Sequence, residues 1–195
     1  MKRVFLDMDG VVADWHSSAC ALHGLKNPAR EPDGPRGDEA WDMCRHLKID
    51  LHKFYKLQDY DFWVGIKKTI EADFIIDACI AALGKSRLCF LSSPCFTIGC
   101  CEGKREWVNR HYPGIPLILS ISAKLGESPP KDFLADNDSF LIDDCGDTVV
   151  KFSDAGGWTY LWPRPWNKRH MAEKQFEHLY DELREELERF AKKGW

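Results

Sequence analysis

The chain has 195 residues, of which 44% are hydrophobic and 30% charged, and its formal net charge is −4. This length can bury one α/β core with a small inserted element, and the composition is that of a globular protein. A basic excess would be expected of a nucleic-acid-binding surface, and no apolar run is long enough to span a bilayer. We therefore expect neither a nucleic acid nor a membrane as a partner.

Two features bear on the compartment. The amino terminus does not have a signal-peptide pattern, because Asp7 and Asp9 interrupt its apolar segment. Cys95, Cys100 and Cys101 follow a Ser-Ser-Pro turn without a C-x-x-C pair or a histidine at zinc-ligand spacing. This pattern favours reduced thiols over a structural zinc, and we expect a cytoplasmic protein.

Hydrophobic periodicity predicts strands that alternate with helices along the chain. The expected strands cover residues 2–6, 87–91, 116–119, 140–142 and 157–161. The expected helices cover residues 70–83, 102–112, 148–155 and about 168–193, and residues 15–68 form a polar, helix-rich region. Such alternation indicates a parallel sheet covered on both faces, so we predict a three-layer, Rossmann-like α/β core.

The expected helix at 168–193 is long and charged, with one apolar face. The face is formed by Phe176, Leu179, Tyr180, Leu183, Leu187 and Phe190. A helix of this kind usually docks its apolar face on the sheet. A homodimer interface is the alternative interpretation.

Polar side chains follow three of the predicted strands, at the point where each strand ends. They form the pairs Asp7/Asp9, Ser92/Ser93 and Asp143/Asp144. In parallel sheets ligands bind at the carboxyl ends of the strands, so these pairs are expected to meet at one edge. Four carboxylates are costly to gather there unless a cation or a reaction requires them, because like charges repel.

The spacing of the first pair suits phosphoryl transfer. Residues two apart in a strand point the same way, so Asp7 and Asp9 can share a site, and Gly10 allows a sharp turn beside an anion. One carboxylate can attack phosphorus, while its partner protonates the leaving oxygen and then deprotonates water. Oxygen ligands favour Mg²⁺, with Asp144 or Asp143 completing its site. Ser92 would donate to a phosphoryl oxygen, and a lysine would neutralise the remaining charge.

These motifs resemble those of a known superfamily. D-M-D-G-V at 7–11, S-S-P at 92–94, a lysine and L-I-D-D at 141–144 are similar in order to the four motifs of haloacid dehalogenase (HAD) superfamily phosphatases. More narrowly, the chain resembles the 5′(3′)-deoxyribonucleotidases and their bacterial and phage relatives. The details that carry this narrower resemblance are D-M-D-G-V-V-A-D, G-K-R-E-W-V at 103–108 and P-R-P-W-N at 163–167.

The resemblance implies a role for each motif residue. Asp7 is the nucleophile, and Asp9 is the acid/base whose backbone carbonyl also binds Mg²⁺. Ser92, with Ser93 beside it, binds phosphate. Asp143 and Asp144 form the acidic pair at the metal, Asp144 being the favoured direct ligand.

The family's catalytic lysine has two candidates. Lys131 precedes the acidic pair by the family's interval and is favoured, whereas Lys124 is the rival. Lys104 matches a second family lysine on the helix after S-S-P, and a plain surface position is its alternative.

The resemblance also implies a small helical cap between the first two motifs. This predicts a core of residues 1–14 and 69–195 and a cap of residues 15–68. Trp15 and Trp63 are candidates for stacking on a nucleoside, because aromatic faces bind bases tolerantly, and packing of the cap on the core is the alternative role.

Three functions follow from these observations. The first is hydrolysis of 5′-(deoxy)nucleoside monophosphates by a Mg²⁺-dependent phosphatase. The second is the same chemistry on another small phosphoester, such as a sugar phosphate. The third is a catalytically inactive binding protein that uses its C-terminal helix for contact. The complete set of catalytic residue types favours an enzyme, and the tryptophans favour a nucleotide.

Overall fold

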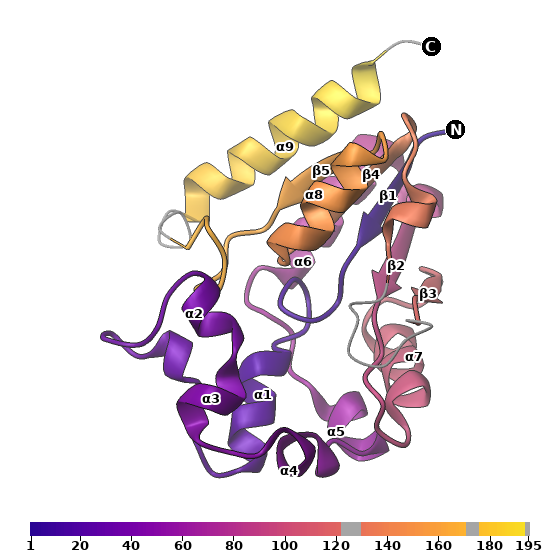
Figure 1. The fold of residues 1–195 in the computed structure, drawn as a ribbon. Helices are drawn as coiled ribbons and strands as arrows, with labels where there is room; N and C mark the ends of the chain where they lie inside the picture. The colour runs from indigo at the N-terminus through magenta and orange to yellow at the C-terminus, as the bar shows by residue number, and fades with distance from the viewer. Residues whose placement is uncertain (122–129, 171–175, 194–195) are drawn as a thin grey trace.

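The structure of the chain is a computed structural model that describes residues 1–121, 130–170 and 176–193. Five parallel strands form one sheet in the order β3-β2-β1-β4-β5 (Figure 1). The strands are β1 (Arg3–Leu6), β2 (Leu88–Ser92), β3 (Leu117–Leu119), β4 (Ser139–Asp143) and β5 (Trp158–Leu161). The predicted parallel α/β sheet is therefore confirmed.

Side chains alternate between the two faces of the sheet, because successive residues of a strand point to opposite sides. In β1, Val4 and Leu6 belong to a large hydrophobic core on one face, whereas Phe5 belongs to a smaller core on the other. The central strands are buried on both faces, which is why they are continuous apolar segments in the sequence.

Four longer helices cover this sheet. They are α6 (Ala72–Leu83), α7 (Cys100–His111), α8 (Gly146–Asp154) and α9 (Phe176–Lys192). Helices α6, α7 and α9 contribute to the large core, and α8 contributes Phe152 to the smaller core on the opposite face. Helix α9 packs on α6, where Tyr180 stacks on Phe74 with ring centroids 3.6 Å apart. The apolar face of α9 therefore packs against other elements of the same chain. A homodimer stays a prediction.

Several helix boundaries differ from those predicted: α7 and α8 each begin two residues earlier, and the starts of α6 and of the C-terminal helix also differ. Helix α6 begins at Ala72, and Ile70, expected on its apolar face, is outside the helix with 85% of its surface exposed. The Thr69 hydroxyl is bonded to the carbonyl of Val11, so the chain is held to the β1 turn before the helix starts. Residues 168–170 form a turn rather than helix, because the Asn167 side chain accepts a hydrogen bond from the Arg169 amide.

Five short helices and one 3₁₀ turn occupy the region between β1 and α6. They are α1 (Trp15–Leu22), η1 (Pro28–Arg30), α2 (Asp38–Trp41), α3 (Met43–Leu47), α4 (Leu51–Lys56) and α5 (Tyr60–Gly65). Helices α1, α3, α4 and α5 each begin at an aspartate that accepts from a backbone amide, which explains why so polar a segment is helical.

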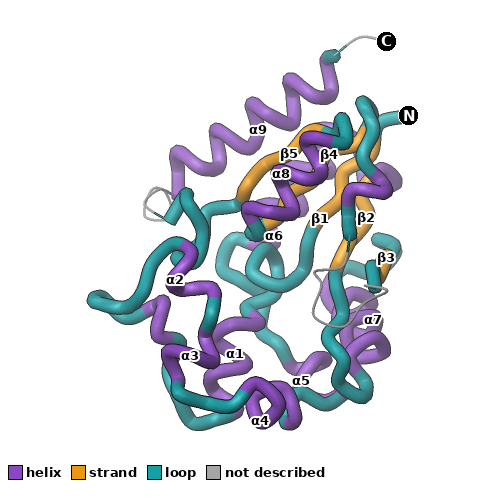
Figure 2. The backbone as a smooth tube through the Cα atoms, viewed as in Figure 1, coloured by secondary structure: helices purple, strands orange, loops and turns teal. Residues whose placement is uncertain are grey.

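These helices lie beyond the carboxyl ends of the strands, with α1, α3 and α4 on the side opposite the chain termini (Figures 1 and 2). They have a small hydrophobic cluster of their own, which includes Ala19, Cys20, Met43 and Phe54. The prediction that residues 15–68 form a cap separate from the core stays a prediction. Two further 3₁₀ turns, η2 (Lys85–Arg87) and η3 (Asp132–Leu134), precede β2 and β4. None of the described helices is long and apolar enough to cross a membrane.

Candidate active site

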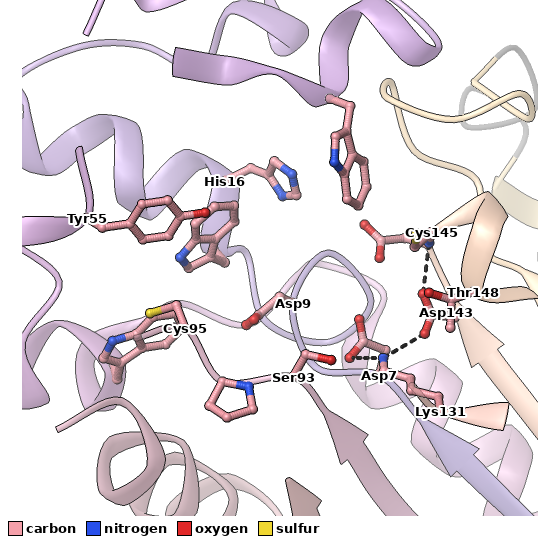
Figure 3. A pocket seen from close by; sticks show the side chains of 15 residues that line it. Asp7, Asp9, His16, Tyr55, Ser93, Cys95, Lys131, Asp143, Cys145 and Thr148 are labelled. Carbon is pink, nitrogen blue, oxygen red and sulfur yellow. Dashed lines mark hydrogen bonds and ion pairs between the residues drawn. The ribbon is translucent and has the colours of Figure 1, made fainter. Parts of the chain in front are cut away.

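A pocket of about 310 Å³ opens at the carboxyl ends of β1, β2 and β4, beneath the short helices (Figure 3). Its polar floor is formed by Asp7, Asp9, Lys131, Asp143 and Asp144, and Ser93 lies on its wall. The sequence-predicted polar residues are therefore brought together, as their positions after neighbouring parallel strands require.

Lys131 links two of the acidic residues. Its ammonium nitrogen lies 2.7 Å from Oδ1 of Asp7 and 2.7 Å from Oδ2 of Asp143 (Figure 3). Burial disfavours the ammonium, but the two carboxylates outweigh it and raise the pKa of Lys131, so this lysine is charged. Burial also raises the pKa of Asp143 to about 6, even though Lys131 and the Cys145 amide favour its carboxylate.

Asp7, Asp143 and Asp144 form a cluster of buried carboxylates whose nearest oxygens lie within 4.8 Å of one another. Burial, together with the charges of Asp143 and Asp7, raises the pKa of Asp144 well above its ordinary value. A hard divalent cation would offset this repulsion, and carboxylate oxygens are the ligands that such a cation prefers. The donor set therefore fits Mg²⁺.

The turn after β1 packs closely against the Asp144 carboxylate. Gly10 has a positive φ of 80°, and a Cβ atom at this position would overlap the Asp144 carboxylate. Only glycine allows both the backbone conformation and this close approach. Arg164 donates to the carbonyls of Gly10 and Val11 and is paired with Glu71 at 3.2 Å, so the turn is fixed by a buried arginine.

Asp9 faces a second buried lysine. The Lys104 ammonium lies 2.5 Å from Oδ2 of Asp9 and also donates to the Ser92 hydroxyl at 2.8 Å and to the Ser93 carbonyl at 3.1 Å. Desolvation raises the pKa of Asp9, with Lys104 opposing it. Lys104 is fully buried, so it is not a plain surface residue.

The two serines differ in exposure. Ser92 ends β2, is fully buried and is not among the residues lining the pocket, whereas Ser93 is half-buried and lines it. Lys131 contacts both Asp7 and Asp143, and its role as the catalytic lysine stays a prediction. Its rival Lys124 lies outside the described residues.

Both predicted tryptophans line the pocket and also pack against the large core. The Trp15 indole donates to Oε1 of Gln58 at 2.9 Å, and the buried Trp63 indole donates to the Gln58 carbonyl at 3.0 Å. Lys104 lies 4.9 Å from the Trp63 ring centroid, so that ring also borders the charged floor.

Several residues of the pocket were not identified from the sequence. His16, Trp41 and Tyr55 line it on the side of the short helices, and Cys95 and Cys145 line it from the strand ends. No motif marks these three residues, and residues 15–63 are hardly richer in aromatic residues than the whole chain, so the sequence did not single them out.

The P-R-P-W-N turn also reaches the site. The Trp166 indole donates to Oδ2 of Asp144 at 2.6 Å, and the side-chain Nδ2 of Asn167 donates to the backbone carbonyl of Asp144 at 2.9 Å. His16 stacks on Trp166 with ring centroids 3.6 Å apart. Burial, followed by the charges of Arg30 and Arg164, lowers the pKa of His16 to about 3, so this imidazole is neutral at physiological pH.

The fold of the chain is shared with known hydrolases. The sequence matches no protein-family model and has no significant match among curated proteins. It is similar in structure to a HAD family hydrolase from Deinococcus radiodurans R1 with bound phosphate and sodium, at 14% identity and a TM-score of 0.51, covering 89% of this chain and 87% of that chain. A hydrolase from Streptococcus pneumoniae TIGR4 is similar at 9% identity and a TM-score of 0.50, covering 90% of this chain and 100% of that chain. The chain therefore has the α/β fold of HAD-family hydrolases.

Proposed function

We propose that this chain is a HAD-superfamily phosphatase that uses Mg²⁺ to hydrolyse 5′-(deoxy)nucleoside monophosphates. The observation that carries the proposal is the contact of Lys131 with both Asp7 and Asp143, with the Asp144 carboxylate completing the cluster. A nucleophile, a fixed positive charge and an oxygen-rich cation site meet there at the floor of one pocket.

Asp7 is the proposed nucleophile. Its Oδ1 is engaged by Lys131, which leaves Oδ2 to form a bond to phosphorus as the ester oxygen leaves. The Lys131 ammonium stabilises the negative charge that develops on the transferred phosphoryl group. Water then attacks the aspartyl-phosphate, which releases inorganic phosphate and restores the carboxylate.

Asp9 is the proposed acid and base of the two steps. Desolvation raises its pKa, which favours the protonated form that gives a proton to the leaving oxygen in the first step. The resulting carboxylate takes a proton from the attacking water in the second step. Lys104 holds Asp9 in place and ties it to the loop of Ser92 and Ser93, which we propose to bind the phosphoryl oxygens.

Asp7, Asp143 and Asp144 are the residues that would hold the metal, with the Asp9 carbonyl as the ligand implied by the family resemblance. When bound, Mg²⁺ offsets the repulsion between the carboxylates and the incoming phosphate. The Trp166 indole orients the Asp144 carboxylate toward this position.

The preference for a nucleotide is supported by the aromatic wall of the pocket. Trp15, Trp41, Tyr55 and Trp63 offer flat apolar surfaces opposite the charged floor, as a phosphate attached to a base requires. A sugar phosphate would leave these surfaces uncovered. All eight cysteines are free thiols, which supports a reducing compartment such as the cytoplasm.

The test is phosphate release from a panel of nucleoside monophosphates and sugar phosphates, with Mg²⁺ and with EDTA. We expect turnover of nucleotides that EDTA abolishes and that Asp7→Asn lowers by at least about a thousandfold, since the nucleophile is lost. Asp147→Asn is the matched control, because this aspartate is exposed on α8 and outside the pocket. Activity that survives both EDTA and Asp7→Asn would overturn the proposal.

A further inference from the structure

One buried side chain contacts both of the tryptophans that were predicted to line the site. Gln58 lies between α4 and α5 and is fully buried. It is not among the described residues that line the pocket, and the proposed mechanism assigns it no role.

The hydrogen bonds of Gln58 fix the orientation of its amide. Oε1 accepts from the Trp15 indole at 2.9 Å, and Nε2 donates to the Phe54 carbonyl at 3.3 Å. An indole nitrogen can only donate and a carbonyl oxygen can only accept, so the opposite orientation of the amide would lose both bonds. The backbone carbonyl of Gln58 accepts from the Trp63 indole at 3.0 Å. One residue therefore holds tryptophans from α1 and α5.

Both indole N–H groups thus have partners within the chain. The Trp63 N–H has the Thr97 hydroxyl, at 3.2 Å, as a further acceptor. Because these donors are already engaged, the two rings offer a ligand their flat faces rather than a hydrogen bond. Trp15 is half-buried and lines the pocket, whereas Trp63 is only 2% exposed, so Trp15 has more of its surface free for a ligand.

Trp63 connects this arrangement to the phosphate side of the pocket. Its ring centroid lies 4.9 Å from the Lys104 ammonium, which also donates to the Ser93 carbonyl at 3.1 Å. Helix α7 packs so closely against the same side chain that a Cβ atom at Gly103 would overlap it. Gln58 therefore fixes Trp15 relative to a ring that is itself held against the core.

Aromatic contacts alone restrain the Trp15 ring only loosely. Tyr55 lies nearly parallel to it, at 23° and 6.1 Å between centroids, and Phe54 meets it edge-on at 6.2 Å. Such contacts tolerate the sliding of one ring over another, whereas a hydrogen bond has a preferred length and direction. The bond to Gln58 is therefore the contact that sets where the Trp15 ring lies in the pocket.

We propose that Gln58 is a positioning residue that presents the face of Trp15 to the base of a 5′-nucleoside monophosphate. This inference rests on the proposed function and extends it to the recognition of the nucleoside. The phosphate is proposed to bind at Asp7 and Lys131, so a displacement of Trp15 affects the base and leaves the reacting groups in place. Contact through the ring face suits purines and pyrimidines alike, because every base has a π surface.

The test compares the steady-state kinetics of Gln58→Met with those of the native protein. The substrates are adenosine 5′-monophosphate, cytidine 5′-monophosphate and ribose 5-phosphate, which lacks a base. We expect KM for both nucleotides to rise about tenfold, because a displaced ring forfeits part of its stacking energy. The nucleotide kcat values, and both constants for ribose 5-phosphate, should change by less than about twofold, because no contact with the reacting groups is lost.

Trp15→Phe is the second variant, because it keeps an aromatic ring and deletes the indole donor. It should also raise KM for the nucleotides. The double variant should be no worse than the more affected single variant, because both substitutions remove the same hydrogen bond. Circular dichroism establishes that each variant is folded, and Trp15→Phe tests the inference alone if Gln58→Met does not fold.

Asn27→Leu is the matched control. Asn27 is another buried amide among the short helices, where its Oδ1 accepts from the Ala29 amide and its Nδ2 donates to the Ser17 hydroxyl at 3.5 Å. These bonds reach neither tryptophan, and Asn27 is not among the described residues of the pocket. The control should therefore lose stability without raising the nucleotide KM.

A binding measurement separates this inference from the proposed function. Isothermal titration calorimetry with adenosine 5′-monophosphate in EDTA requires no turnover, and Gln58→Met should weaken this binding about tenfold. If the nucleotide binds in this way and is not hydrolysed when Mg²⁺ is added, the proposed phosphatase fails and the positioning role stands.

Four results would overturn the positioning role while leaving a phosphatase intact. They are a nucleotide KM that Gln58→Met leaves unchanged, equal rises in KM for the nucleotides and ribose 5-phosphate, additive effects of Trp15→Phe and Gln58→Met, and an equal rise in Asn27→Leu.

Discussion

The indole nitrogen of Trp166 donates a 2.6 Å hydrogen bond to Oδ2 of Asp144. This bond joins the turn after β5 to the carboxylate cluster at the end of β4, and both side chains are buried. A buried carboxylate that loses a donor becomes costlier to ionise, so the relationship bears on both stability and metal binding.

Replacing Trp166 with phenylalanine should remove this bond while keeping an aromatic ring against His16. We expect a loss of about 1–3 kcal/mol in the free energy of unfolding, because a buried hydrogen-bond acceptor loses its partner. The rise in melting temperature on adding Mg²⁺ should also become smaller. Urea denaturation and thermal melts with and without the metal measure the two effects.

Trp162→Phe is the matched control for that variant. Trp162 is equally buried, but its indole nitrogen has no hydrogen-bond partner within the described part of the chain. It should therefore lose packing without losing a hydrogen bond. If the two variants were equally destabilised and responded equally to Mg²⁺, the Trp166–Asp144 bond would have no special role.

Gly10→Ala should both strain the backbone and push on Asp144. An alanine at a φ of +80° costs about 1–2 kcal/mol, and the overlap of its Cβ with the carboxylate adds about 1–3 kcal/mol. Gly24→Ala is the control, because Gly24 also has a positive φ of 66° but a Cβ there would meet nothing within 4 Å. Denaturant unfolding of both variants should separate the two contributions, and equal losses would contradict the overlap.

Lys104→Met should move the acid limb of the pH–rate profile. Lys104 opposes the desolvation that raises the pKa of Asp9, so its removal should raise that pKa further. The carboxylate form of Asp9 then appears only at higher pH, so the acid limb of the kcat profile should shift to higher pH. Lys104→Arg keeps the positive charge and should shift the limb less. A Lys104→Met profile that coincides with that of the native protein would argue against Asp9 as the proton carrier.

His16 should make the protein sensitive to mild acid. Its pKa is about 3 when folded and near 6.5 when unfolded, so below pH 6.5 the unfolded state binds a proton that the folded state does not. Stability from this group is fully present above pH 6.5 and is lost as the pH falls toward 3, by about 2 kcal/mol at pH 5. His16→Phe lacks this dependence, so urea unfolding should show the native protein losing stability relative to the variant. A constant difference between neutral pH and pH 5 would contradict the prediction.

The sheet and its acidic edge could be predicted from the sequence because they depend on local patterns. Apolar segments of strand length end at Asp7, Ser92 and Asp143, and parallel strands place such ends on one side. The cluster of Asp7, Asp143 and Asp144 follows from that rule alone.

Which of Ser92 and Ser93 is buried and which lines the pocket could not be predicted in the same way. Adjacent residues at a strand end point in opposite directions, so a shift of one residue in the boundary exchanges the buried side chain and the pocket side chain. Strand β2 includes Ser92, which places its hydroxyl against Lys104 and leaves Ser93 at the pocket.

The sequence by itself determined the order of the strands along the chain, the acidic residues at their ends and the family resemblance, because hydrophobic periodicity and short motifs are local properties. Tertiary structure alone decided that Lys131 lies between Asp7 and Asp143, that Trp166 holds Asp144, and that Cys95 faces the pocket. Those contacts join segments distant in the chain, and they depend on how the loops return to the sheet edge, which no local pattern encodes.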